Sequence, residues 1–178
     1  MLKIFSVIGA VLVVGVAVVL ILAAMKPDQF RVSRSAVIKA PPEKIFPLIN
    51  DFKAWTAWSP YENKDPAMKR TYGSSTSGKG ATYAWDGNSN VGGGNMLITD
   101  APAPSKVALD LNMTRPMTAH NKVEFTLTPA GDSTTVTWVM NGNAPYWAKI
   151  FHVFFNMDKM VGGDFEAGLA KLKVVAEK

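Results

Sequence analysis

The first stretch of the chain is apolar throughout and differs sharply from everything that follows it. Residues 4–25 include no charged residue, and Lys3 and Lys26 bracket the run. As a helix rising 1.5 Å per residue, this segment would be about 33 Å long, enough for a hydrocarbon core of about 30 Å. The pattern therefore predicts a membrane anchor in residues 1–26, followed by one domain in residues 27–178.

Two other interpretations of the apolar run are weaker. A cleaved signal peptide has a shorter apolar region and a small-x-small cleavage site, whereas Leu22-Ala23-Ala24-Met25 offers bulky residues before any cut. A buried core helix normally carries some polar edge. The positive-inside rule, counted literally, keeps the domain in the cytoplasm, but long domains translocate largely regardless of charge. We therefore expect a single-pass protein of the cell membrane and leave the side of the domain open.

Beyond the anchor, the pattern changes to short strands and helices. Residues 30–38 are typical of a strand that ends at Ala40-Pro41-Pro42, because proline cannot continue a strand ladder but suits the first turn of a helix. A short amphipathic helix is predicted after these prolines. A second short helix is predicted over residues 52–58 and is expected to stop at Ser59-Pro60.

The middle of the domain alternates between apolar and polar residues with the period of a strand. Each of the last three predicted strands has one apolar face and one face rich in Thr, Asn, Asp, Lys or Glu, so one side of the sheet should face water. The predicted strands cover residues 68–72, 81–85, 95–99, 106–113, 121–128 and 133–140.

The C-terminal segment provides the cover for the apolar side of this sheet. Val161, Phe165, Leu169, Leu172 and Val175 recur at helical spacing, and Gly162-Gly163 is expected to bend the helix near its start. Residues 146–155, just before it, are unusually apolar and are interpreted as a helical turn at the mouth of the sheet or as a part that touches the bilayer.

Composition removes several classes of chemistry. The absence of cysteine excludes thiolate metal sites, cysteine nucleophiles and iron–sulfur clusters, and two histidines make a histidine-rich metal site a poor expectation. The net charge of +5 is spread without a basic run, so no nucleic-acid partner is expected. No metal, cofactor or catalytic residue is assigned.

One glycine-rich loop and five titratable residues are the candidates for chemistry. Residues 73–80 approach a phosphate-binding loop, but Gly80 stands where Ser or Thr would bind magnesium, and a strand follows, so a flexible connection is predicted. The acid–base candidates are expected at the surface or in structural roles, although either histidine could line a pocket. These candidates are Asp86, Asp110, Glu124, His120 and His152.

Three segments resemble the START-like superfamily, also called SRPBCC. They are residues 37–46, where the first strand enters the first helix, residues 55–60 (Trp-Thr-Ala-Trp-Ser-Pro), and residues 157–169, which open the last helix. More specifically, the chain is similar to the bacterial polyketide cyclase/dehydrase and lipid-transport group, many of whose members carry one N-terminal membrane segment. The resemblance covers about residues 30–176.

This resemblance implies an α+β helix-grip fold, in which an antiparallel sheet wraps around a long C-terminal helix. From the residues alone, the many aromatic and methionine side chains favour a plain core, whereas the resemblance favours a cavity between sheet and helix. It carries over no catalytic residue. The residues that it implies as lining this cavity are Trp58, Tyr83, Trp85, Leu111, Phe125, Trp138, Met160 and Phe165.

The predicted function is a membrane-tethered binding domain for a small hydrophobic or amphipathic ligand, such as a lipid or a polyketide-like compound. Its partners are this ligand and, through residues 4–25, the membrane, and the sequence identifies no protein partner. Two alternatives stay open. One is a cyclase- or hydrolase-type enzyme that uses the same cavity, and the other is a protein-interaction module that docks through residues 146–155.

Overall fold

The computed structural model describes residues 2–178, without the side chains of residues 2–4, 6 and 7. Its order of elements matches the predicted strand, two short helices, six strands and a long C-terminal helix, with two additional short helices. The elements are α1 (Leu2–Ala24), β1 (Gln29–Ile38), α2 (Pro42–Asn50), the 3-10 helix η1 (Ala54–Ala57), α3 (Pro60–Lys64), β2 (Lys69–Tyr72), β3 (Thr82–Asp86), β4 (Gly93–Asp100), β5 (Lys106–Arg115), β6 (Ala119–Ala130), β7 (Ser133–Asn143), α4 (Tyr146–Phe154) and α5 (Met157–Ala176).

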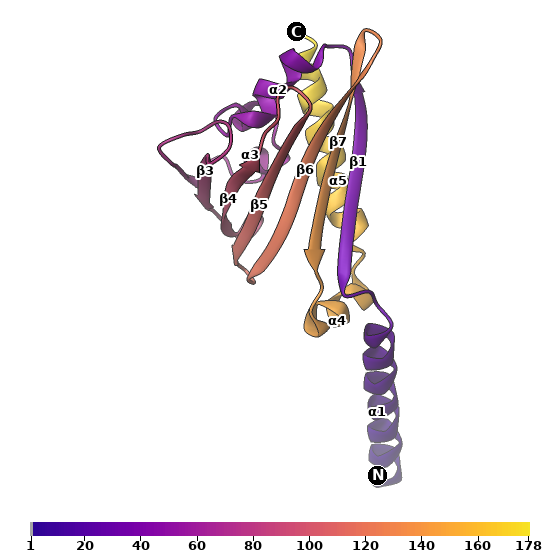
Figure 1. Cartoon of the computed structure of the whole chain (residues 1–178). Coiled ribbons are helices and arrows are strands. Elements are labelled where there is room, and N and C mark those ends of the chain that lie inside the picture. The colour runs from indigo at the N-terminus through magenta and orange to yellow at the C-terminus, as the bar shows by residue number, and fades with distance from the viewer. Residues whose placement is uncertain (1) are drawn as a thin grey trace.

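Helix α1 extends away from one end of the domain, beside α4, and the C-terminus lies at the opposite end (Figure 1). Part of the predicted membrane span, the side chains of Ile4, Ser6 and Val7, lies outside the described part of the structure. Among the described residues, no helix is both long enough and apolar enough to cross a membrane.

The strands form one antiparallel sheet in the order β1-β7-β6-β5-β4-β3-β2. The predicted strands are confirmed, and most are longer in the structure by one to three residues at an end. After β1, the chain passes through α2, η1 and α3 to β2, at the opposite edge of the sheet. Strands β2 to β7 then follow one another across the sheet, so that the last strand, β7, pairs with β1. The result is a sheet with one edge at β1 and the other at β2.

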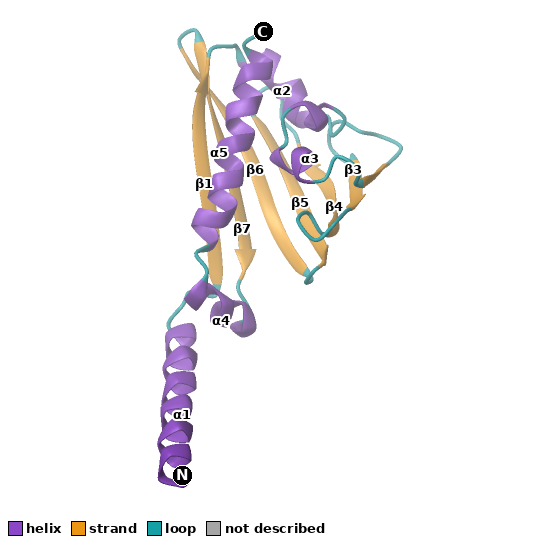
Figure 2. Ribbon diagram, turned by 180° about the vertical axis from the view of Figure 1, so that it is seen from behind, coloured by secondary structure: helices purple, strands orange, loops and turns teal. Residues whose placement is uncertain are grey.

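Helix α5 lies across one face of the sheet, which we call the inner face, and α2, η1 and α3 cover the part of that face near β3 to β5 (Figure 2). The core forms between these helices and the sheet, where Phe165, Leu169 and Leu172 of α5 are buried. The Asn156 side chain caps α5 by accepting a hydrogen bond from the Lys159 backbone N–H at 3.1 Å. The α+β helix-grip architecture is thereby confirmed.

The second short helix ends before Ser59-Pro60, as predicted, because η1 ends at Ala57. Pro60 then begins the short helix α3, which was not predicted, since proline fits a first helical position. Helix α5 continues through Gly162 and Gly163 to Ala176, and the bend expected at these glycines stays a prediction.

The glycine-rich loop of residues 73–80 was expected to be a flexible connection but is tied down by backbone hydrogen bonds. Phe52 N–H donates to the Thr76 carbonyl at 2.9 Å, and Gly80 N–H donates to the Ile98 carbonyl at 2.8 Å. Gly78 and Gly80 adopt positive φ angles of 75° and 90°, which favour glycine. Strand β3 follows the loop, so the helix that a phosphate-binding loop requires is replaced by a strand.

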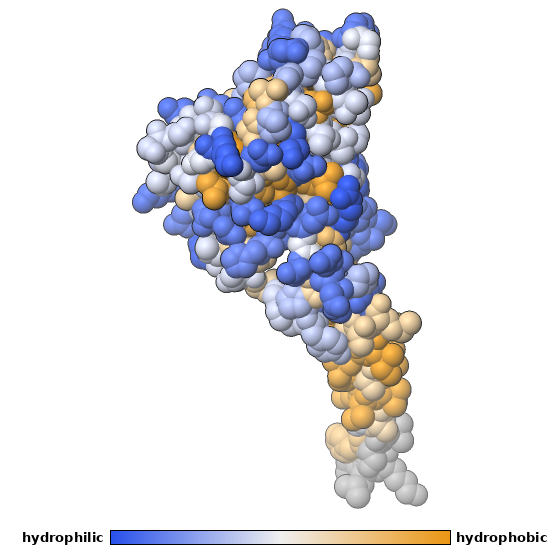
Figure 3. Space-filling model, in the orientation of Figure 1, coloured by the Kyte–Doolittle hydropathy of each residue, from blue (hydrophilic) through white to orange (hydrophobic). Residues whose placement is uncertain are grey.

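The opposite, outer face of the sheet is mostly hydrophilic with a small apolar area, while the coloured part of α1 is hydrophobic (Figure 3). This confirms the predicted alternation, in which one side of the sheet is covered and the other faces water.

Candidate ligand-binding site

The register of the sheet arranges the predicted cavity residues in rows across the inner face. Because neighbouring strands are antiparallel and in register, residues opposite one another belong to the same row. Three rows matter here, named from the α4 end inward. They are an outer row of Trp85, Gly94 and Met113, a second row of Tyr83, Met96, Leu111, Asn121, Gly142 and Phe30, and a deep row of Val107, Phe125, Trp138 and Arg34.

Around the deep row, four of the predicted residues pack into one aromatic cluster. The Trp138 ring stacks on Phe165 of α5 with ring centroids 3.9 Å apart and planes 8° apart, and it lies 4.8 Å from Phe125. Trp58 meets the edges of Phe125 and Trp138 at 6.0 and 5.7 Å. All four side chains are buried, so this half of the predicted site is packed aromatic core.

The other predicted residues lie toward the α4 end of the domain and are more open. Tyr83 is buried and stacks on Trp85 at 6.0 Å, while Trp85 and Leu111 are only half-buried. Met160, in the first turn of α5, is 53% exposed. The inner face therefore becomes more accessible from the deep row to the outer row, and the lining role of the eight residues stays a prediction.

Glycines make room for the large side chains of these two open rows. A Cβ on Gly94 would come within 2.6 Å of the Trp85 ring, and a Cβ on Gly142 would come within 2.1 Å of Asn121 Oδ1 and 2.6 Å of the Phe30 ring. Because Gly94 and Gly142 have no side chain, the Trp85 and Phe30 rings can approach the backbone closely at these two positions.

Three polar atoms of the inner face are buried without a hydrogen-bond partner among the described residues. They are Tyr83 Oη and Asn121 Oδ1 in the second row and Trp138 Nε1 in the deep row. Burial, together with the nearby Glu62 carboxylate, raises the pKa of the Tyr83 hydroxyl, so this group stays protonated and can donate. Sequence reasoning chose Tyr83 and Trp138 but missed Asn121, a polar residue at an inward position of β6.

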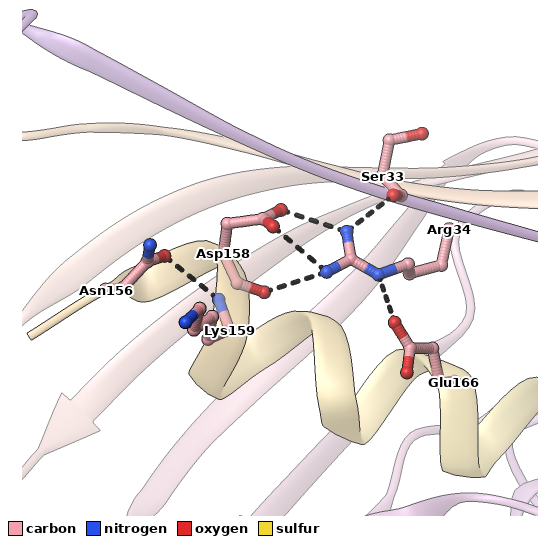
Figure 4. Close-up of polar contacts among 6 residues, drawn as sticks. All are labelled: Ser33, Arg34, Asn156, Asp158, Lys159 and Glu166. Carbon is pink, nitrogen blue, oxygen red and sulfur yellow. Dashed lines mark hydrogen bonds and ion pairs between the residues drawn. The ribbon is translucent and has the colours of Figure 1, made fainter.

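Arg34 holds the start of α5 against β1 (Figure 4). Its guanidinium donates to both carboxylate oxygens of Asp158 at 2.9 and 3.0 Å and to the Asp158 carbonyl at 3.0 Å. It also donates to Glu166 Oε1 at 2.6 Å and to the Ser33 carbonyl at 2.9 Å. These bonds use the whole donor set of the side chain and fix the helix that carries Phe165.

The close approach of Arg34 also explains Gly162. A Cβ at this position would lie 2.1 Å from the guanidinium Nη2, whereas a Cβ on Gly163 would have no neighbour within 4 Å. Sequence reasoning missed Arg34, although a signal was present. Arg34 is the charged residue among the inward positions of β1, which alternate as Phe30, Val32, Arg34, Ala36 and Ile38.

The acid–base candidates are mostly on the wrong face for a reaction in the predicted cavity. Asp86, Asp110, Glu124 and His120 all alternate to the outer face of the sheet, where Lys122 pairs with Asp110 and Arg115 with Asp86. His152 of α4 is half-buried beside the Phe30 ring, and burial and the nearby Lys26 lower its pKa. His120 therefore lies away from the predicted cavity and lines a hollow on the outer face instead.

Two hollows are present on the outer face. One, of about 430 Å³, is lined by polar residues that include Gln29, Asn112 and His120, and the His120 Nδ1 lies 2.7 Å from Asn112 Oδ1. The other, of about 240 Å³, is lined by residues that include Arg31, Glu124 and Val139. Both are open to solvent, and neither contains any of the eight predicted ligand-binding residues.

Metal ligands do not gather anywhere in the described part of the chain, where no group of three or more acidic or histidine side chains could hold an ion.

Solved structures share this fold at low sequence identity. A protein of Chromobacterium violaceum is 14% identical with a TM-score of 0.60, over 86% of this chain and 99% of its own. A protein of Nitrosospira multiformis is 18% identical with a TM-score of 0.59, over 82% of this chain and 94% of its own. DynU16, a protein of the dynemicin biosynthetic locus, is 13% identical with a TM-score of 0.58, over 86% of this chain and 48% of its own. Comparison with curated proteins gives no match.

At the level of sequence families, residues 29–177 match the family described as polyketide cyclase / dehydrase and lipid transport. The match runs from the first residue of β1 to just past the end of α5 and leaves out α1. Because it spans well over half of the chain, this protein belongs to the polyketide cyclase / dehydrase and lipid transport family.

Proposed function

We propose that this protein binds a small hydrophobic or amphipathic molecule, a lipid or a polyketide-like compound, between the inner face of the sheet and α5. The observation that carries the proposal is that Tyr83 Oη, Asn121 Oδ1 and Trp138 Nε1 have no hydrogen-bond partner among the described residues, on a face that is largely apolar and aromatic. A buried polar group left unpaired costs about 1–3 kcal/mol. A ligand with apolar surface and a hydrogen-bonding group would remove part of that cost.

The ligand enters from the α4 end of the inner face, past Trp85, Leu111 and Met160. These residues are less buried than the aromatic cluster behind them, so they can move apart without opening the core. Methionine adapts its shape to different apolar partners. Burying about twelve methylenes at roughly 0.8 kcal/mol each gives about 10 kcal/mol, comparable with the roughly 8.2 kcal/mol of a micromolar complex before ordering costs.

The binding domain is tethered to the cell membrane by α1. Support comes from the 22 uncharged residues 4–25 and from the large apolar side chains of α1, among them Val13 and Ile21, which are exposed in the structure. Exposed apolar surface of this extent is unfavourable in water and favourable in a bilayer.

A titration of the full chain with palmitate, followed by native mass spectrometry from a mild detergent, tests ligand binding. We expect Tyr83→Phe to lower the affinity by about 5- to 10-fold, as for the loss of one hydrogen bond. Ser35→Ala is the control, because it removes a hydroxyl from the outer face of β1, on the opposite side of the sheet from the open rows. Equal affinities for Tyr83→Phe and the unaltered chain would argue against the role of Tyr83, and no bound palmitate, phospholipid or polyketide-like compound in any variant would contradict the function.

A further inference from the structure

Helix α4 presents an aromatic surface to solvent. Tyr146, Trp147, Phe151 and Phe154 of this nine-residue helix, together with Phe155 directly after it, are between 38% and 66% exposed. The Phe151 and Phe155 rings stack at 4.3 Å. We call these five side chains the α4 aromatic surface.

This surface carries no formal charge. Lys149 is the one Lys, Arg, Asp or Glu of α4, and it is buried and paired with Asp28 in the link after α1. Burial and the nearby Lys26 lower the pKa of His152 in the same helix, so this side chain is neutral at pH 7. None of the five side chains of the α4 aromatic surface is charged, so transferring them from water to another environment dehydrates no ion of this surface.

The α4 aromatic surface lies beside the end of α1. The Tyr146 hydroxyl donates to the Leu20 carbonyl at 2.8 Å, and Ala23 is fully buried. Both ribbon views place α4 next to the point where α1 leaves the domain (Figures 1 and 2). The exposed apolar residues of α1 and the aromatic residues of α4 thus occupy the same end of the molecule.

We propose that the α4 aromatic surface lies in the headgroup region of the bilayer that α1 enters. In this arrangement the domain contacts the membrane directly and is not attached to it through α1 alone. This proposal rests on the proposed role of α1. A helix of nine residues is too short to span the hydrocarbon core, and Trp and Tyr are favoured at membrane interfaces. Contact through α4 turns the open end of the inner face toward the lipid, which gives an amphipathic ligand a route between the bilayer and the domain.

The absence of cysteine makes the test direct, because one introduced cysteine can carry a nitroxide label. Three full-length variants are used, Phe154→Cys in α4, Val13→Cys in α1 and Val174→Cys, which replaces a 61% exposed side chain near the C-terminal end of α5. Each is reconstituted in vesicles of phosphatidylcholine and phosphatidylglycerol, and power-saturation spectroscopy compares collisions with oxygen, which concentrates in lipid, and with a water-soluble nickel chelate.

We expect the labels at positions 13 and 154 to collide more with oxygen, and the label at position 174 to collide more with the nickel chelate. If position 13 is in lipid but position 154 is in water, the α4 inference is wrong and the anchor stands. If position 154 is shielded from both reagents, a protein covers α4, which also overturns the inference. A water-exposed label at position 13 would refute the anchor itself and the inference with it.

Discussion

At the scale of single residues, the hydrogen bonds of Arg34 fix the position of α5 on the sheet. A charged residue at an inward position is costly unless its donors are satisfied, and here Asp158, Glu166 and two backbone carbonyls satisfy them. The strand pattern places Arg34 inward, but its two carboxylate partners, Asp158 and Glu166, lie more than a hundred positions away in the sequence. Sequence patterns of single elements do not contain that information, which is why this contact was missed.

Two neighbouring glycines provide a matched pair for this contact. Gly162→Ala should lower the free energy of unfolding by about 1–3 kcal/mol, because its Cβ would overlap the pinned Arg34 guanidinium. Gly163→Ala should raise it by about 0.5–1 kcal/mol, because this position has open space and alanine is the better helix former. Urea unfolding of both variants measures the difference, and stabilisation by both would contradict the close packing of Arg34 on the helix.

The same contact predicts a pH dependence. The hydrogen bonds from Arg34 lower the pKa of the Asp158 carboxyl, so the folded state favours the charged form. The stabilisation is present above the unfolded pKa of about 3.9 and is lost as the pH falls through the lower folded value. Thermal unfolding between pH 6 and pH 2.5 should therefore show a larger loss for the unaltered chain than for Asp158→Asn. Parallel curves would show that Asp158 is not linked to folding.

At the scale of elements, the strands and the covering helix were predictable because their side chains alternate with the period of the element. Val107, Leu109 and Leu111 of β5 all face inward as the pattern predicts. The helical spacing of Phe165, Leu169 and Leu172 likewise identified the face of α5 that is buried. The short helix α3 was not predictable, since Pro60 is suited to end one helix as well as to begin another.

The packing of α5 on the sheet can be tested at Phe165, which stacks on Trp138. Phe165→Ala should lower the free energy of unfolding by about 3–5 kcal/mol, as is usual for truncation of a buried aromatic residue. Val174→Ala, on the exposed side of the same helix, should change it by no more than about 0.5 kcal/mol. Similar small effects at both positions in denaturant unfolding would mean that α5 does not pack on the sheet in this way.

At the scale of the whole molecule, apolar and aromatic surfaces gather at one end. Helix α1, the α4 aromatic surface and the open rows of the inner face lie at this end, and the C-terminus lies at the other (Figure 1). The sequence predicted which aromatic residues converge, since each lies on an inward position of its element. It could not separate the packed cluster around Trp138 from the more open region around Leu111, because that difference depends on how far α5 and the sheet diverge.

Binding of a hydrophobic or amphipathic ligand to the inner face can be tested on the whole protein. The most direct measurement is native mass spectrometry of the full chain isolated in mild detergent from the cells that produce it, with chemical identification of what the protein releases on denaturation. The account predicts a stoichiometric lipid or polyketide-like molecule, with reduced occupancy in Leu111→Glu, where a charge would stand in the second row. A protein recovered empty from repeated preparations, and unable to take up such molecules when they are added, would contradict it.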